Sequence, residues 1–258
     1  MKLTRLIALV AVLALVAAAC NGDEPDADNE LGLIAPGVLT VCTDAPYSPM
    51  EFEDENGEYT GFEIELMRAI ATELGLSGIE VVNTGFDPIE SGLALNAGDC
   101  DIAAASITIL PEREERVDFA DGHFTADQSL LVRDDAGVTS LAEFGGLSLA
   151  VQSNTTGEAF AQENAPEGTD IRSFENPGDV FVALEANNVQ GVLQDIVPNA
   201  DYALNNEGVT LAETFPTNES YGFAVKEGAA DLLAAVNAAL QTLRDNGTYD
   251  QLYNEWFG

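Results

Sequence analysis

From Val38 to the C-terminus, strand-like and helix-like segments alternate, and this alternation constrains the fold more than any other feature of the 258 residues. Short β-rich runs such as Val38–Thr43 are followed by segments whose apolar residues recur at helical spacing. Repeated βα units favour an α/β fold with mostly parallel sheets. A second series of units begins after residues 129–132, so two lobes with a cleft between them are expected.

The pattern also predicts where regular structure begins and ends. Strands are expected at residues 38–43, 79–82, 101–106, 129–132, 147–151, 191–193 and 223–225. Helices are expected at residues 62–74, 89–96, 156–164, 180–187, 200–205, 230–245 and 249–257. Pro111 starts a further short helix at its first position, and Ser140 with Glu143 forms a capping box that starts another.

The first nineteen residues have the composition of a secretory signal. Lys2 and Arg5 form a basic start, and Leu6–Ala19 is an apolar run that is too short for a comfortable membrane span. Small residues before Cys20 resemble a bacterial lipoprotein signal, so we expect lipidation of Cys20; a plain secretory signal is the alternative. Residues 20–35 are expected to form an acidic tether, since the stretch after Cys20 is almost free of apolar side chains. The protein is thus expected to be anchored to the outer face of the cytoplasmic membrane.

The charge balance is strongly acidic, with 45 acidic residues against 9 basic ones and a net charge of −36. This balance argues against a nucleic-acid partner, because phosphates are bound by Lys and Arg. It also argues against a polybasic membrane contact, which leaves the lipid anchor as the expected attachment. The acidity is typical of a highly solvated surface, and with two lysines in the chain a saline habitat is a further interpretation.

Two cysteines remain after Cys20. Cys42 and Cys100 make an even pair in an exported protein, and such a pair favours a disulfide. Two buried free thiols are the alternative.

A search of the sequence for catalytic residues finds little. The single histidine, His123, lies among aromatic residues, where a packed or surface histidine is favoured over a base, and one histidine gives no metal spacing. Motifs of serine hydrolases, phosphate loops and zinc proteases do not occur in the sequence. Carboxylate pairs such as Asp99 and Asp101 carry no weight in so acidic a chain. No catalytic residue, metal ion or cofactor is therefore expected.

Aromatic and polar side chains follow several of the expected strands. Tyr47 and Phe86 come after the first two strands, where loops line the ligand crevice of an α/β fold; the alternative is that each caps a sheet edge. Ser106 and Thr108 close the third strand, and Arg113 follows them. Hydroxyls with a guanidinium suit a carboxylate, which arginine can hold through two parallel hydrogen bonds.

The second series of units offers a complementary set. Residues 154–157, Asn-Thr-Thr-Gly, precede a helix whose free N–H groups also favour an anion. Asp195 ends a strand, where its carboxylate could take an ammonium group. Together the two series indicate a clamp for a zwitterion, with Arg113 and amide donors at one end and Asp195 at the other.

Three motifs, in this order, resemble the polar amino-acid-binding proteins of ABC importers. They are Phe52…Gly57…Gly61-Phe-Glu-Ile-Glu-Leu-Met67, Ser106-Ile-Thr-Ile-Leu-Pro-Glu-Arg-Glu-Glu-Arg-Val-Asp-Phe-Ala-Asp121 and Leu243-Arg-Asp-Asn-Gly-Thr-Tyr249…Trp256-Phe-Gly258. The likeness runs from about Val38 to the C-terminus. It implies the periplasmic binding protein-like II fold, in which two α/β lobes are joined by a two-strand hinge. The first lobe would comprise residues 36–127 plus 220–258, and the second lobe residues 128–219.

The resemblance also implies roles for the residues of the clamp. Arg113 matches the arginine that pairs with the ligand's α-carboxylate, and Thr156 matches a residue whose backbone N–H faces the same group. Ser106 would contribute contacts from the strand end, and Thr108 would support the carboxylate. Asp195 matches the acid of the other lobe that takes the α-ammonium group.

Further residues are implied around the ligand's side chain. Tyr47 and Phe86 match aromatic walls, and Asp44 matches an acid that often meets the side chain. Cys42 and Cys100 would lie on neighbouring strands of the first lobe, which supports a disulfide. The expected ligand-binding residues are Asp44, Tyr47, Phe86, Ser106, Thr108, Arg113, Gln152, Thr155, Thr156, Gln194 and Asp195.

Two positions depart from the pattern of glutamine-specific relatives. Those relatives carry Lys at the position of Gln152 and His at that of Gln194, and this chain has neither. Two glutamines with Asp44 suit a polar or cationic side chain. An acidic ligand is least expected, because no second cation converges on the pocket.

The function implied is that of a receptor and not of an enzyme. A lipid-anchored monomer would capture a free amino acid by lobe closure and hand it to the permease subunit of an ABC transporter. One alternative is a cyclohexadienyl or arogenate dehydratase-like enzyme on the same scaffold. Another is a sensory or scaffold module, although no transmembrane or signalling segment accompanies the two series of units in the sequence.

Overall fold

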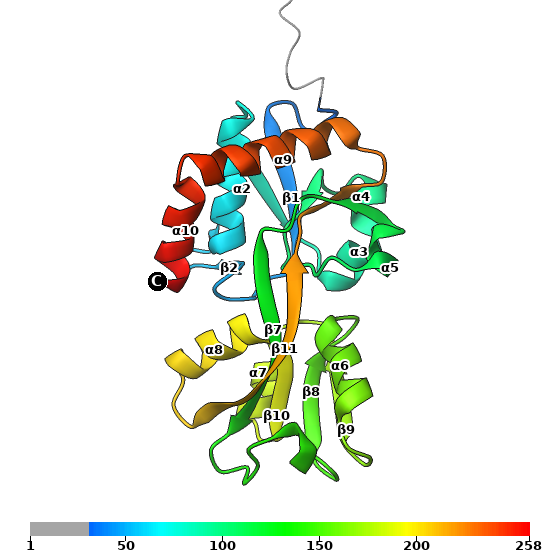
Figure 1. Cartoon of the computed structure of the whole chain (residues 1–258), viewed down its shortest axis with the longest axis vertical. Coiled ribbons are helices and arrows are strands. Elements are labelled where there is room, and N and C mark those ends of the chain that lie inside the picture. Colours follow the sequence, from blue (N-terminus) through cyan, green and yellow to red (C-terminus); the bar gives the residue numbers. More distant parts are fainter. Residues whose placement is uncertain (1–30) are drawn as a thin grey trace, which may run out of the picture.

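Two five-stranded sheets, each flanked by helices, form two lobes that follow one another along the long axis of the molecule (Figure 1). The computed structural model describes residues 31–258. The expected signal peptide, Cys20 and most of the acidic tether lie outside the described residues. The expected α/β class with two sheet-containing lobes is confirmed. In the described part of the chain, no helix is both long enough and apolar enough to span a bilayer.

The first lobe holds both ends of the described chain. Its sheet has the order β4-β1-β5-β12-β6, in which β4, β1 and β5 are parallel while β12 is antiparallel to β5 and β6. Its strands are β1 (Val38–Thr43), β4 (Gly78–Asn83), β5 (Ile102–Ala103), β6 (Val117–Phe119) and β12 (Ala224–Lys226), with a small hairpin of β2 (Phe52–Glu53) and β3 (Tyr59–Thr60). Its helices are α2 (Phe62–Glu73), α3 (Phe86–Glu90), α4 (Leu93–Ala97), α5 (Pro111–Glu114), α9 (Ala230–Asp245) and α10 (Thr248–Phe257).

The second lobe has the sheet order β11-β7-β10-β8-β9. Strands β10, β8 and β9 are parallel, and β7 is antiparallel to both β10 and β11. Its strands are β7 (Phe124–Arg133), β8 (Ser148–Gln152), β9 (Asp170–Phe174), β10 (Gly191–Asp195) and β11 (Val209–Tyr221). Its helices are α6 (Thr156–Asn164), α7 (Asp179–Glu185) and α8 (Ile196–Asn205), with a 3-10 turn η1 (Leu141–Glu143).

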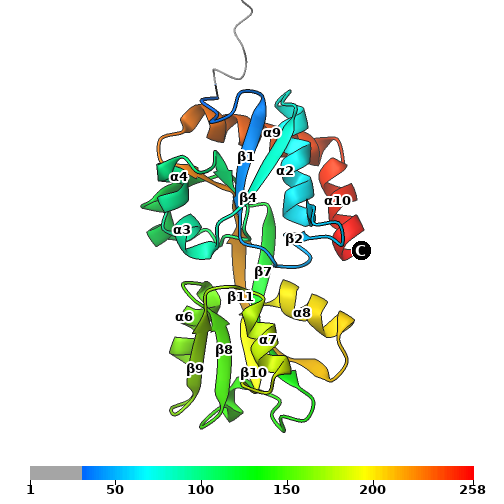
Figure 2. The ribbon, with the colours of Figure 1, turned by 180° about the vertical axis from the view of Figure 1, so that it is seen from behind.

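The strands β7 and β11 pass side by side from one lobe to the other (Figures 1 and 2). They pair from Phe124 opposite Tyr221 to Arg133 opposite Val209, and their register shifts between Phe215 and Glu219. The predicted lobe boundaries, at residues 127/128 and 219/220, fall inside these two strands. The chain therefore crosses between the lobes twice and finishes in the first one.

Burial of the periodic residues explains why these segments fold as they do. Phe62, Leu66 and Ile70 of α2 are fully buried, as their helical spacing predicts, and they share a core with β1 and α9. The central strand β5 is covered on both faces of the sheet, because Ile102 packs in one core and Ala103 packs in another.

Several expected elements differ from the structure. The helix expected at residues 89–96 is two short helices, α3 and α4, because Gly92 between them adopts a left-handed conformation with φ 73°. The strand expected to reach Ser106 ends at Ala103, and Ser106 itself has φ 49°. The capping box at Ser140 is present, but it starts a 3-10 turn and no α-helix.

Five strands were not predicted, namely β2, β3, β6, β9 and β11. The strands β2 and β3 have two residues each, which is too short for a pattern. β9 lies at the edge of its sheet and is mostly exposed, so it carries few apolar residues that could reveal it. β11 contains Pro216 and acidic residues, and its bulge breaks the alternation of side chains. β6 has three residues, which is too short for a pattern.

Candidate functional site

A cavity lies between the two lobes, at the carboxyl ends of β1, β8 and β10. All eleven residues predicted to bind a ligand line it. Three further residues complete the lining, namely Glu51, Ala105 and Gly157. The structure therefore brings the predicted residues together in one place, and their role in binding remains a prediction.

One wall of the cavity carries the guanidinium of Arg113. The residue follows Pro111 in α5 and is 4% exposed. It donates hydrogen bonds to the backbone carbonyls of Thr108 (3.0 Å) and Asn154 (3.1 Å), and its Cζ atom lies 5.1 Å from the centre of the Phe86 ring. Burial lowers the pKa of Arg113 from its ordinary value. A desolvated cation with N–H groups beyond these two bonds suits an anionic ligand group.

The opposite wall carries the carboxylate of Asp195, at the end of β10 in the second lobe. Its Oδ2 atom accepts hydrogen bonds from the hydroxyl of Tyr47 (2.8 Å) and from that of Tyr221, and its Oδ1 atom accepts one from Gln128. The pKa of Asp195 is raised to about 6, chiefly by burial and next by the charge of Glu219, and the three hydrogen bonds oppose both effects. The three side chains that donate to this buried carboxylate are all neutral, so a ligand cation would relieve its desolvation.

A second acidic group lies at Asp44 and Glu51 of the first lobe. The carboxylate of Asp44 accepts a 2.6 Å hydrogen bond from Nε2 of Gln152, which belongs to the other lobe. Glu51 accepts a 3.2 Å bond from the hydroxyl of Ser106. Burial raises the pKa of Asp44 to about 6, and burial followed by the charge of Glu63 raises the pKa of Glu51 well above its usual range. The cavity therefore carries more carboxylate than its one arginine can balance.

Behind this acidic group lies the single histidine. His123 is buried, stacks on Phe223 with ring centres 3.9 Å apart, and places Nε2 2.7 Å from a carboxylate oxygen of Glu63. The other oxygen of Glu63 accepts the backbone N–H of Ser106 at 2.9 Å. His123 is thus a packed residue that supports the cavity floor and does not line it, in agreement with its predicted packed role.

The hydroxyl groups of the lining are largely engaged inside the protein. Thr155 caps α6 by accepting the backbone N–H of Glu158 and donates to the carbonyl of Gln152 at 2.8 Å. Thr108 donates to Glu219 at 2.7 Å, so its expected support of a ligand carboxylate would come through position and not through this hydrogen.

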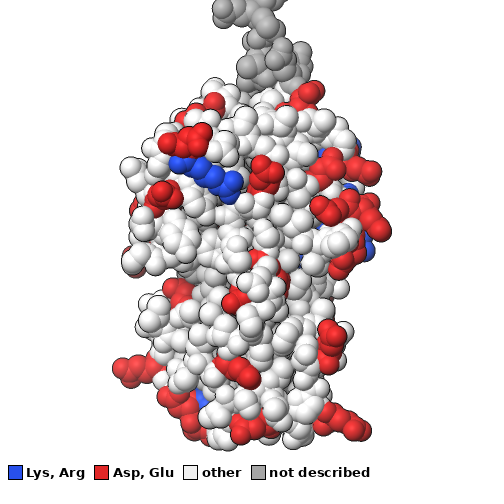
Figure 3. Space-filling model, viewed as in Figure 1, with Lys and Arg blue, Asp and Glu red and all other residues white. Residues whose placement is uncertain are grey.

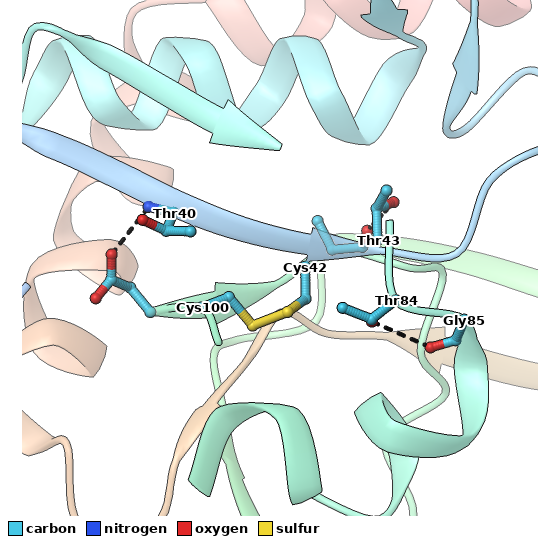
Figure 4. Close-up of a disulfide and its surroundings, with 8 residues drawn as sticks. Thr40, Cys42, Thr43, Thr84, Gly85 and Cys100 are labelled. Atoms are coloured by element: carbon cyan, nitrogen blue, oxygen red, sulfur yellow. Dashed lines mark hydrogen bonds between the residues drawn. A yellow bond between two sulfur atoms is a disulfide. The ribbon is translucent and has the colours of Figure 1, made fainter. Parts of the chain in front are cut away.

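The disulfide joins Cys42 to Cys100, and both residues are buried (Figure 4). Cys42 lies in β1, two residues before Asp44, and Cys100 precedes β5. Next to it, a carboxylate oxygen of Asp101 accepts the backbone N–H of Thr40 at 2.9 Å. The crosslink and this bond fix the strand β1 to the segment just before β5.

Sequence reasoning missed three polar residues of the site. Glu51 was overlooked although it follows Tyr47 closely. Gln128 is fully buried beside the apolar run of β7, and a polar residue at such a position was a usable signal. Glu219 gave no signal, because only the pairing of β11 with β7 brings it to Gln128, whose Nε2 donates to it at 2.8 Å.

The visible surface is acidic, as the sequence predicts. Asp and Glu are spread over the face shown in Figure 3, and Lys and Arg are few on it. Such a surface produces a negative field around the cleft, which attracts cations and repels anions.

Comparison with known proteins relates the whole described fold to one family. Residues 39–258 match the family model of bacterial extracellular solute-binding proteins, family 3. The chain is 32% identical over 264 residues to the ABC transporter glutamine-binding protein GlnH of Bacillus subtilis, with 97% of this chain and 94% of that protein covered.

Two solved structures are similar in both fold and sequence. An ancestral arginine-binding protein bound to arginine has a TM-score of 0.79 and 36% identity, covering 86% of this chain and 99% of its own. The ancestral amino acid-binding protein AncCDT-1, a precursor of cyclohexadienyl dehydratase, has a TM-score of 0.79 and 39% identity, covering 86% and 96%.

Proposed function

The chain belongs to the bacterial extracellular solute-binding proteins of family 3, and we propose that it captures a free polar or cationic amino acid for an ABC importer. The supporting relatives are named for glutamine and arginine binding. The proposed ligand site is the cavity between the lobes.

The observation that carries the proposal is the pairing of opposite charges across this cavity. Arg113 and Asp195 are both more than nine-tenths buried and belong to opposite lobes. A free amino acid has a carboxylate and an ammonium group on one carbon, and these match a guanidinium and a carboxylate on facing walls. The N-terminus of α6, at Thr156, adds free N–H groups near the carboxylate end.

Capture is proposed to proceed by closure of the lobes about β7 and β11. Bonds between Tyr47 and Asp195, between Gln152 and Asp44 and from Arg113 to the carbonyl of Asn154 cross from one lobe to the other. Opening the cleft would break these bonds and admit a ligand. Closing it would bury the ligand beside its charged partners, which is a hinge motion.

The remaining parts of the proposal concern the protein's place in the cell. An exported chain with a lipid on Cys20 and an acidic tether would stay on the outer face of the cytoplasmic membrane. It would act as a monomer and deliver its amino acid to a permease subunit.

A second candidate function is catalysis in the same cleft. The likeness to AncCDT-1, a precursor of cyclohexadienyl dehydratase, favours testing it. We propose that the protein is not such an enzyme, because Arg113 and Asp195 form an amino-acid clamp and the one histidine is packed outside the cavity. Incubation with prephenate or arogenate, followed by product absorbance, tests this alternative, and turnover would overturn the binding proposal.

The binding proposal is tested by a thermal-shift screen of the purified protein against the twenty amino acids, ornithine and cystine. A molecule that binds the native state raises the melting temperature in proportion to RT ln(1 + [L]/Kd). We expect a polar or cationic amino acid to give the largest rise. A screen in which no amino acid raises it would contradict the proposal.

A further inference from the structure

The side-chain amide of Gln194, which lines the cavity, is held in one orientation by a residue outside it. Asn199 of α8 is fully buried and donates from Nδ2 to the hydroxyl of Ser129 (3.0 Å) and to the carbonyls of Ser129 (3.3 Å) and Val192 (3.4 Å). These acceptors fix its amide group, so its Oδ1 atom faces Gln194. Nε2 of Gln194 donates to that oxygen at 3.0 Å. The assignment follows from the network of partners, as amide orientations must.

This orientation leaves Oε1 of Gln194 as a buried acceptor without a protein partner. Gln194 is 3% exposed and lines the cavity, so a ligand bound there is the candidate donor for this oxygen. A buried acceptor that stays unpaired is costly, and a ligand donor removes the cost.

The polar side chains that contact Asp44 and Glu51 already use their hydrogen-bond donors within the protein. The hydroxyl of Ser106 donates to Glu51, and Nε2 of Gln152 donates both to Asp44 and to the carbonyl of Glu175 (3.2 Å). What these groups offer a ligand is therefore acceptors: two carboxylates and, from Gln194, an amide oxygen.

We propose that Asn199 is a positioning residue that determines specificity. It orients Gln194 so that the side-chain oxygen of Gln194 is available to the ligand. The cavity then selects an amino acid whose side chain ends in a cation that has hydrogen-bond donors and no acceptor. The inference rests on the proposed capture of an amino acid by Arg113 and Asp195. A guanidinium has five N–H donors and no acceptor, and an ammonium has three donors and no acceptor. Either group can satisfy the carboxylates of Asp44 and Glu51 together with the free oxygen.

Neutral and acidic side chains fit this set of acceptors less well. The amide of a glutamine ligand carries an oxygen that needs a donor, and a glutamate carries only acceptors. A site built to accept hydrogen bonds rejects such ligands because buried polar atoms are left unpaired. The raised pKa values of Asp44 and Glu51, caused chiefly by burial, agree with two carboxylates that lack a cation.

The test measures the dissociation constants of L-arginine, L-lysine and L-glutamine by calorimetry for the native protein and for Asn199→Ala. We expect the native protein to bind L-arginine and L-lysine roughly tenfold or more tightly than L-glutamine, because a hydrogen bond to a charged group has an effect of about this size. In Asn199→Ala the amide of Gln194 can turn, so the ratio of the glutamine constant to the arginine constant should fall severalfold. Asn205→Ala, an exposed position on the same helix, is the matched control and should leave that ratio unchanged.

A second variant keeps the test decisive if Asn199→Ala folds poorly. Gln194→Met removes the acceptor at similar volume and should weaken arginine binding by about tenfold. Gln190→Met alters a glutamine of the same lobe outside the cavity and should not. The inference would be overturned if the native protein bound glutamine and arginine with equal affinity. It would also be overturned if the ratio of the two dissociation constants stayed native in both Asn199→Ala and Gln194→Met. In either case the proposed capture of an amino acid would stand. Failure of the native protein to bind any amino acid would overturn both.

Discussion

The hydroxyl of Tyr47 donates a 2.8 Å hydrogen bond to Asp195, which lies 148 residues away in the sequence and on the other lobe. Tyr47 belongs to the loop after β1, and Asp195 ends β10. The same carboxylate is thus the proposed ammonium site and a contact between the two lobes. Ligand binding and closure are expected to depend on one another through it.

Asp195→Asn tests this coupling. Loss of the negative charge should weaken amino-acid binding, and it should also weaken closure, because the amide is a poorer acceptor for Tyr47 and Tyr221. Ligand-induced compaction, measured by small-angle X-ray scattering, should decrease together with the affinity. Asp201→Asn, on α8 outside the cavity, is the control. Native compaction in Asp195→Asn would count against the coupling.

The pH dependence of stability should reveal the buried carboxylate of Asp44. Its pKa in the folded protein is about 6, above the ordinary value of 3.8, so between these values the folded state binds more protons than the unfolded state. The contribution of Asp44 to stability is therefore present below about pH 4 and is lost as the pH rises through about 6. Moving this pKa from 3.8 to about 6 corresponds to at most about 3 kcal/mol of unfolding free energy.

Asp44→Asn isolates this contribution. Without ligand, the variant should gain stability over the native protein at pH 7.5 and lose that advantage near pH 4, as measured by denaturant unfolding. In the native protein, affinity for a cationic amino acid should rise as the pH increases through 6, since the cation binds the deprotonated carboxylates. A stability difference that does not change with pH would show that Asp44 does not titrate as described.

Asn154 forms a second link between the lobes. Its carbonyl accepts from Arg113 at 3.1 Å, and its side chain donates to Asp87 at the start of α3. Asn154→Gly keeps the left-handed φ of 61° and removes the side-chain bond. We expect dissociation of the bound amino acid, followed by stopped-flow fluorescence, to become about two- to fivefold faster.

The control for this change is Asn187→Gly. Asn187 is exposed, has a φ of 57° and lies after α7, away from the cavity. It should leave the dissociation rate unaltered. If both glycine variants release ligand at the same rate, Asn154 does not hold the cleft.

The disulfide is expected to stabilise the first lobe without contacting the ligand. It closes a loop with a sequence separation of 58, for which the loss of chain entropy in the unfolded state predicts a stabilisation of about 4 kcal/mol. Replacing both Cys42 and Cys100 by Ala should lower the melting temperature clearly and change the ligand affinity little. A variant that melts like the native protein would show that the crosslink contributes little to stability.

The fold was readable from the sequence where local patterns decide the structure. Helix α2 follows from the spacing of Phe62, Leu66 and Ile70, and α6 has the bounds that were expected, residues 156–164. Elements that depend on an unusual backbone conformation, or that lie at the edge of a sheet, could not be predicted from the sequence. Gly92 divides an expected helix through its left-handed conformation, and β9 is an exposed edge strand.

The candidate site was predictable to the extent that its residues sit at strand ends. Asp195 does so at the end of β10, and Arg113 lies in the short helix α5 on the chain after β5. Gln128 reaches Asp195 because β7 pairs with β10, which places these two residues opposite one another, and Glu219 reaches Gln128 because β11 pairs with β7. Such pairing depends on the whole fold, and a local pattern does not contain it.

The most direct test of the account is calorimetry on Arg113→Ala and Arg116→Ala with the amino acid that gives the largest thermal shift. Both changes remove an arginine near Glu90, but Arg113 is buried in the cavity wall and Arg116 is 46% exposed. We predict that Arg113→Ala loses measurable binding while its fold remains intact, and that Arg116→Ala binds as the native protein does. Affinity close to native in a folded Arg113→Ala variant would contradict the proposed clamp.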